Sequence, residues 1–90
     1  MKLIITLDTE GDNQWSRQPS RSVENIRSIP RFQQLCDRFD FKPTYLCTYD
    51  VAAADVFEEI LVPYQQDGVA EIGAHLHPWA TPPYEPFWDA

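Results

Sequence analysis

The stretch Glu71-Ile-Gly-Ala-His-Leu-His-Pro78 decides the fold, because it joins a short β-rich run directly to two histidines. Residues 69–74 have the composition of a strand, and Asp67-Gly68 just before them is a signal that ends a helix. Side chains that directly follow a strand lie where α/β folds place their functional sites, at the carboxyl ends of parallel strands. Whether this placement applies here depends on the elements that come earlier in the chain.

Two further strands are predicted upstream. Residues 2–7 form a short apolar run that does not alternate cleanly, which is typical of a strand buried on both faces. Residues 44–48 are rich in β-forming side chains, and we read 49–54 as the connector that follows them. Residues 8–21 are polar and contain glycine and proline, which predicts a loop at the carboxyl end of the first strand.

Two helices are predicted between these strands. Apolar side chains at three- and four-residue spacing predict a helix over about 29–39, with Ser28 as its N-cap and a separate turn before it. Asp55 and Glu58 have the spacing of a capping box and predict the start of a second helix that runs to about residue 66. The order is thus strand, helix, strand, helix, strand, which predicts an α/β fold of the parallel β-α-β-α-β type.

Composition excludes several classes of function. The 90 residues contain 7 Lys and Arg against 14 Asp and Glu, a net charge of −7, so we expect no nucleic-acid binding. We find no apolar run long enough to span a membrane or to act as a secretory leader, and therefore expect a cytoplasmic protein. Cys36 and Cys47 have no metal-binding spacing, and we expect both to be buried, reduced thiols.

Asp8 and Glu10 are the first candidate functional residues. They stand two positions apart at the end of the first strand, so in extended chain their carboxylates point to the same side. Taken alone, they are more typical of loop carboxylates that are solvated or that cap a turn, because acids at strand ends are common turn residues. Their significance depends on what lies beside them in space.

His75 and His77 are the only histidines, and they also stand two positions apart after a strand. Taken alone, such a pair is also compatible with one buried and one exposed structural histidine. Adjacent parallel strands bring their carboxyl ends to one edge of the sheet, so the imidazoles and the two acids are expected to converge there. Two histidines, one carboxylate and an open position form a common catalytic site for zinc and other divalent ions. The other carboxylate is then free to act as a base.

The segment that follows the histidines is rich in proline and aromatic residues. Trp79 and Tyr84 are our candidates for stacking on sugar rings, and packing against the body of the domain is the alternative.

Three stretches together resemble the polysaccharide deacetylase family, which has the NodB homology domain. They are Leu3-Ile-Ile-Thr-Leu-Asp-Thr-Glu10, Pro43-Thr-Tyr-Leu-Cys-Thr48 and Glu71-Ile-Gly-Ala-His-Leu-His-Pro78. The resemblance covers nearly all of residues 1–90 but only the N-terminal part of the family domain. The resemblance implies that the chain forms the first part of a distorted (β/α) barrel. It also implies a reaction, the removal of acetyl groups from N- or O-acetylated carbohydrates. These carbohydrates are the partners that we expect.

The resemblance also assigns roles to the candidate residues. Asp8 matches the family's general base, which deprotonates a metal-bound water. Glu10 takes the place of the metal-binding acid, one position later than is usual in the family. His75 matches the first metal histidine, and His77 replaces the second, because Trp79 stands where that residue usually lies. The implied cofactor is a divalent metal ion, with zinc expected.

Other interpretations stay open from the sequence. The later motifs of the family have no counterpart in residues 1–90, so we expect the isolated chain to be weakly active or inactive. A truncated, non-catalytic fragment that binds metal or sugar is therefore the main alternative. A two-carboxylate glycosidase is disfavoured because Asp8 and Glu10 lie on one strand rather than on opposite sides of a scissile bond. A phosphate-binding module would need a glycine-rich loop, and the chain has three glycines. Oligomeric state cannot be predicted from this sequence.

Overall fold

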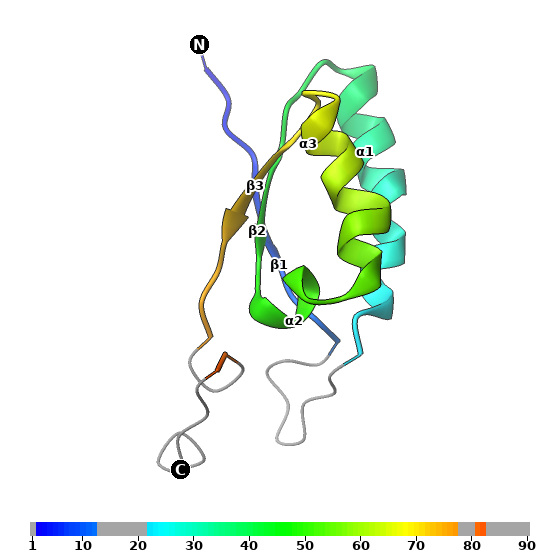
Figure 1. Ribbon diagram of the computed structural model, residues 1–90. Helices are drawn as coiled ribbons and strands as arrows, with labels where there is room; N and C mark the ends of the chain where they lie inside the picture. The colour runs from blue at the N-terminus through cyan, green and yellow to red at the C-terminus, as the bar shows by residue number, and fades with distance from the viewer. Residues whose placement is uncertain (1, 13–21, 78–80, 83–90) are drawn as a thin grey trace.

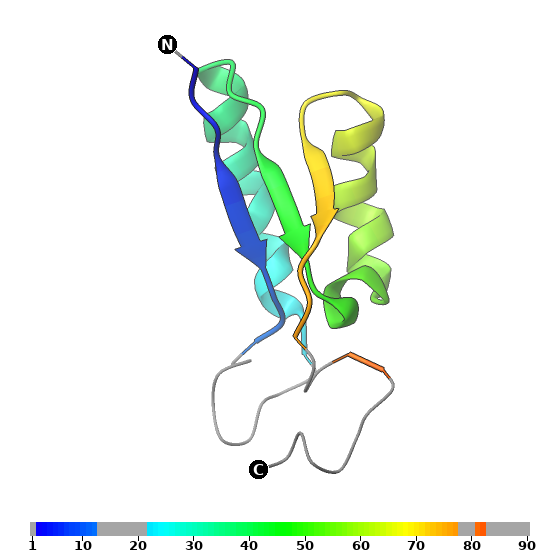
Figure 2. The same cartoon turned by 90° about the vertical axis from the view of Figure 1, so that its left-hand side faces the viewer.

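Three short parallel strands form the frame of the molecule. The structure is a computed structural model that describes residues 2–12, 22–77 and 81–82. Strands β1 (Thr6–Thr9), β2 (Thr44–Cys47) and β3 (Glu71–Ala74) lie in that order in one sheet, with β2 in the centre. Figure 2 shows the three strands side by side and pointing the same way. The predicted parallel β-α-β-α-β arrangement is confirmed, whereas closure into a barrel stays a prediction.

The register of the strands places the ends of all three at one edge. Asp8 pairs with Leu46, which pairs with Gly73. In the next row Thr9 pairs with Cys47, which pairs with Ala74. Backbone hydrogen bonds continue one residue beyond the strands: the N–H of Thr48 donates to Thr9 O at 3.1 Å, and that of His75 donates to Cys47 O at 2.9 Å. The row after the strands is therefore made of Glu10, Thr48 and His75.

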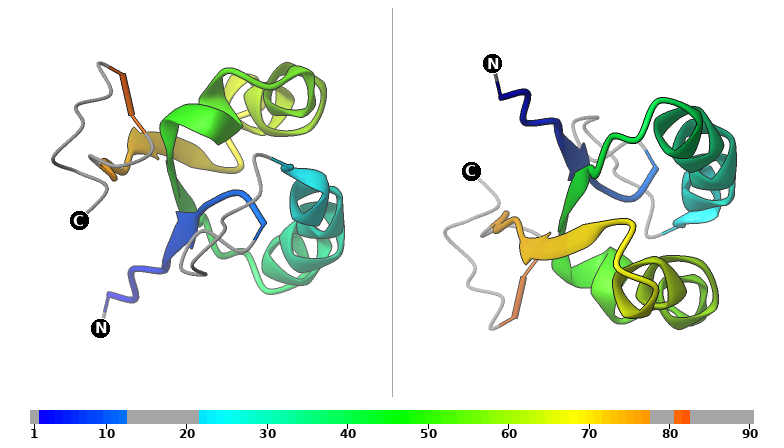
Figure 3. Two further views of the ribbon diagram at one scale, coloured as in Figure 1. Left: turned by 90° about the horizontal axis from the view of Figure 1, so that it is seen from below. Right: turned by 90° about the horizontal axis from the view of Figure 1, so that it is seen from above.

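Helices cover one face of this sheet. The first crossover consists of the 3₁₀ turn η1 (Glu24–Ser28) and helix α1 (Ile29–Arg38), and the second contains α2 (Tyr49–Ala52), the π-helical turn η2 (Phe57–Leu61) and α3 (Val62–Gln66). Figure 1 shows α1 and α3 on the same side of the strands, and the views along the strands in Figure 3 agree. None of the helices in the described ranges is long and apolar enough to cross a membrane.

The core lies between the sheet and these helices. Its buried apolar members are Ile26, Cys36, Tyr45, Cys47, Val51, Val56, Leu61 and Ala70. Both cysteines are free and buried, as predicted. Burial raises the pKa of the Cys47 thiol to about 11 and also raises the pKa of the Tyr45 phenol.

One buried polar network crosses the core, and no local sequence pattern predicts it. The Tyr45 hydroxyl donates to Gln33 Oε1 at 2.7 Å, and Gln33 Nε2 donates to Asp37 Oδ1 at 2.9 Å and to Val69 O at 3.2 Å. Gln33 is 1% exposed, so its amide needs these partners to offset the loss of water. The network joins α1 to the central strand and to the chain that leads into β3.

The second face of the sheet is not covered by the described helices, which corrects the prediction of a first strand buried on both faces. Leu3 and Ile4, which lead into β1, are 64% and 82% exposed. The physical reason is that both crossovers pass over the same face. On the open face, a Cβ at Gly73 would lie 2.9 Å from Leu46 Cδ2, so the glycine leaves room for the leucine side chain.

Local predictions for the helices held in outline and failed at the caps. Ser28 makes no capping hydrogen bond, because η1 runs directly into α1 and the N–H of Ile29 already donates to Ile26 O. Asp55 is the first helical residue of the second stretch, and Val56 takes the cap position of η2, with no side-chain capping hydrogen bond. The predicted connector over 49–54 contains the short helix α2. The helix bounds at residues 29 and 66 and the turn at Gly68, with φ of 75°, agree with the sequence.

Candidate metal centre

The four predicted residues converge at the carboxyl edge of the sheet. Asp8 lies in β1, and Glu10 follows its last residue. His75 and His77 follow β3, and the backbone bond from His75 to Cys47 O holds the first of them in line with the sheet. The topology thus brings together side chains that are more than sixty positions apart in sequence.

Three ligand atoms of this group meet at one point. His75 Nε2 lies 2.9 Å from His77 Nε2, and Glu10 Oε1 lies 3.5 Å from the former and 3.1 Å from the latter. A tetrahedral ion with bonds of about 2.0–2.1 Å holds its ligand atoms about 3.3 Å apart, so these spacings match one face of such a shell. The Glu10, His75 and His77 group could therefore hold a metal ion.

The close approach of the two rings is compatible with a shared proton or with a bound cation. Two unprotonated imidazole nitrogens 2.9 Å apart repel each other through their lone pairs, so a proton or a cation must lie between them. The nearby carboxylates of Glu10 and Asp8 add two negative charges. A divalent cation would relieve both effects at once, whereas one proton relieves them only in part.

Asp8 contacts the outer side of the same ring. Its Oδ1 lies 3.3 Å from His75 Nδ1. A proton on Nδ1 directed at this carboxylate leaves the lone pair of Nε2 facing Glu10 and His77, which is the tautomer that a metal ligand needs. Asp8 is not one of the three converging ligands, and its side chain is 63% exposed, so it stays accessible to solvent.

Burial differs sharply between the two histidines. His77 is 2% exposed, whereas the His75 side chain is 24% exposed. His77, the less exposed of the two, is also the residue whose role as a metal ligand followed least directly from the sequence. Its position beside Glu10 supports its inclusion in the group.

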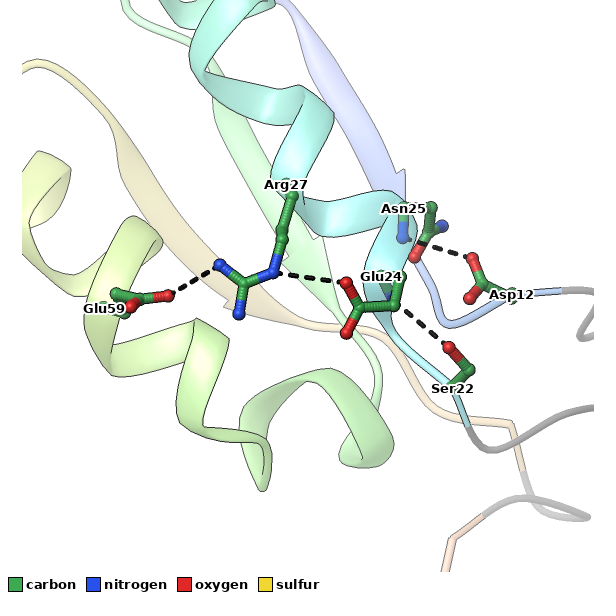
Figure 4. A network of polar contacts seen from close by, with 6 residues as sticks. All are labelled: Asp12, Ser22, Glu24, Asn25, Arg27 and Glu59. Carbon is green, nitrogen blue, oxygen red and sulfur yellow. Dashed lines mark hydrogen bonds and ion pairs between the residues drawn. The ribbon is translucent and has the colours of Figure 1, made fainter.

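Asn25 holds the backbone that carries Glu10, a role that no sequence pattern predicts. Its Nδ2 donates to Glu10 O at 2.9 Å, and its backbone N–H donates to Asp12 Oδ1 at 3.2 Å. Figure 4 shows Asn25 and Asp12 facing each other at the start of η1. Glu10 lies beyond β1, so this bond fixes a carbonyl outside the strand. No spacing rule links residues 10 and 25, and only the fold reveals the contact.

The two predicted substrate-binding residues, Trp79 and Tyr84, lie outside the described residues. Stacking on sugar therefore stays a prediction for both.

Comparisons with known proteins add no evidence about the site. No protein-family model, curated protein or solved structure matches the chain.

Proposed function

We propose that the chain contributes the metal-binding part of a hydrolase that removes acetyl groups from N- or O-acetylated carbohydrates. The observation that carries the proposal is the convergence of Glu10 Oε1 with the Nε2 atoms of His75 and His77. The reaction and the substrate class rest on the resemblance of the three motifs to polysaccharide deacetylases. Zinc is the proposed ion, because two imidazoles and one carboxylate are a typical catalytic zinc ligand set.

In this proposal each residue has a defined task. Glu10, His75 and His77 would hold the cation, which would supply Lewis-acid chemistry by polarising the acetyl carbonyl and acidifying a water. Asp8 accepts the proton of the attacking water, because it is exposed and adjacent to the centre but outside the ligand group. Its contact with Nδ1 also keeps the His75 ring in the ligating tautomer.

Metal titration of single variants tests the assignment of ligands. Zinc binding to the 90-residue chain is measured by competition with a chromophoric chelator. Glu10→Gln, His75→Ala and His77→Ala are expected to lose binding, whereas Asp8→Asn keeps an acceptor oxygen for His75 and is expected to retain it. Unchanged binding in His77→Ala would remove that residue from the centre.

Acetate release from an N-acetylglucosamine oligomer tests the reaction. Because the later motifs of the family have no counterpart in residues 1–90, we expect at most slow metal-dependent release from this chain, and Asp8→Asn, with metal binding intact, should abolish whatever release is seen. Zinc binding with no release in either protein would instead favour the non-catalytic metal-binding alternative. An absence of zinc binding in the unaltered chain would refute the proposed function.

A further inference from the structure

Thr48 stands at the centre of the row that contains the metal ligands. The ladder bonds from Thr48 N to Thr9 O and from His75 N to Cys47 O align residue 48 between positions 10 and 75. Its backbone is extended, with φ of −75° and ψ of 170°. Side chains alternate along a strand, and Tyr45 and Cys47 belong to the helix-covered core. Alternation therefore assigns the Thr48 side chain to the open face, together with Glu10 and Asp8.

The hydroxyl of Thr48 is buried without a hydrogen-bond partner among the described residues. Thr48 is 1% exposed, and its Oγ1 is shielded from solvent and unpaired. Threonine before a helix ordinarily caps the first turn, but Thr48 makes no side-chain cap to α2. An unpaired buried hydroxyl destabilises a fold, so a valine of the same shape would suit this position better if packing were its only task.

We propose that Thr48 is a positioning residue of the metal centre, whose hydroxyl donates to the Glu10 carboxylate when the cation is bound. This inference rests on the proposed function. With Oε1 of Glu10 directed at His75 and His77, the second carboxylate oxygen needs a donor. Carboxylates that bind metals are themselves held by hydrogen bonds, and the hydroxyl in the adjacent row is placed to supply one after rotation about χ1.

The proposal predicts opposite effects of one substitution on two measurements. Thr48→Val keeps the shape and removes the hydroxyl. The metal-free variant should be as resistant to urea as the unaltered chain or more so, because an unpaired buried donor is lost. Its zinc affinity should fall about 10-fold, the usual lower bound for losing a partner of a ligand. A purely structural role would move both measurements in the same direction.

The experiment combines urea denaturation in chelator with zinc titration of four proteins. Thr48→Ser restores the hydroxyl and should restore affinity to within about threefold. Thr44→Val is the matched control, because Thr44 begins the same strand, four rows from the row of Glu10 and His75, and should leave affinity unchanged. Equal zinc affinity in Thr48→Val and the unaltered chain would overturn the inference alone. So would marked destabilisation of metal-free Thr48→Val, since that would indicate a helix cap. Failure of the unaltered chain to bind zinc would overturn the proposed function and this inference with it.

Discussion

Replacing Asn25 by alanine tests whether the loop after β1 is held in place for the metal. The substitution removes one hydrogen bond, from Asn25 Nδ2 to Glu10 O at 2.9 Å, and keeps the backbone bond to Asp12. A neutral hydrogen bond contributes about 0.5–1.5 kcal/mol, and this bond is exposed to solvent, so water can hydrate the Glu10 carbonyl that loses its donor. If this energy serves to fix Glu10, zinc affinity falls by about 2- to 10-fold, since 1.4 kcal/mol corresponds to a factor of ten.

The assay is a zinc competition titration of Asn25→Ala beside a control on the same turn. Arg27→Gln is suitable, because Arg27 pairs only with the exposed Glu24 and Glu59 among the contacts drawn in Figure 4. Exposed ion pairs contribute about 0–1 kcal/mol to stability. Neither Glu24 nor Glu59 contacts Glu10 or the two histidines among the contacts described, so zinc affinity should not change in this control. Unaltered affinity in Asn25→Ala, or an equal loss in the Arg27 control, would refute the reasoning.

Two further predictions concern the core beneath the site. Tyr45→Phe leaves Gln33 Oε1 buried without its donor and should lower the free energy of unfolding by about 1–3 kcal/mol in urea, whereas adding Gln33→Met should recover part of the loss. A full additive loss in the double variant would show that the pair is not coupled. Burial raises the pKa of Cys47 from 9.0 to about 11, so the stability that its neutral thiol contributes is complete below pH 9 and is lost as the pH rises toward 11. Urea midpoints measured from pH 8 to 11 should fall over this range, and the fall should be smaller in Cys47→Ala.

The parts of the fold that follow from local patterns were predictable. Apolar spacing placed α1, and the Asp67-Gly68 turn fixed the start of the segment that leads into β3. The convergence of Glu10 with the histidines followed from the rule that parallel strands end at one edge. Each of these inferences needs only one element or one topological rule.

The failures share a physical cause, which is that they depend on how elements pack. Ser28 is a residue type that often caps helices, but it makes no capping hydrogen bond because the preceding turn continues directly into the helix. The apolar segment before β1 gave no sign that both crossovers would pass over one face. The buried amide of Gln33 and the Asn25 contact join segments that are distant in sequence, and no local pattern records such partners.

The arrangement of the strands also explains why Glu10, the longer of the two acids, is the one that joins the candidate metal-binding group. β1 and β3 are not neighbours, and β2 separates them by two strand spacings, about 9–10 Å. A contact across this distance requires long side chains from both sides and a small residue between them. Glu10 lies in the same row as Thr48 and His75, and its side chain reaches Nε2 of His75 across Thr48. Asp8 lies two rows earlier and has a shorter side chain, and it contacts Nδ1 of the same ring. Side-chain length and row thus place Glu10 in the candidate metal-binding group, and under the proposed function they leave Asp8 to orient the ring and accept a proton. A centre built this way depends on a small residue at position 48, and threonine is small enough while still offering a donor.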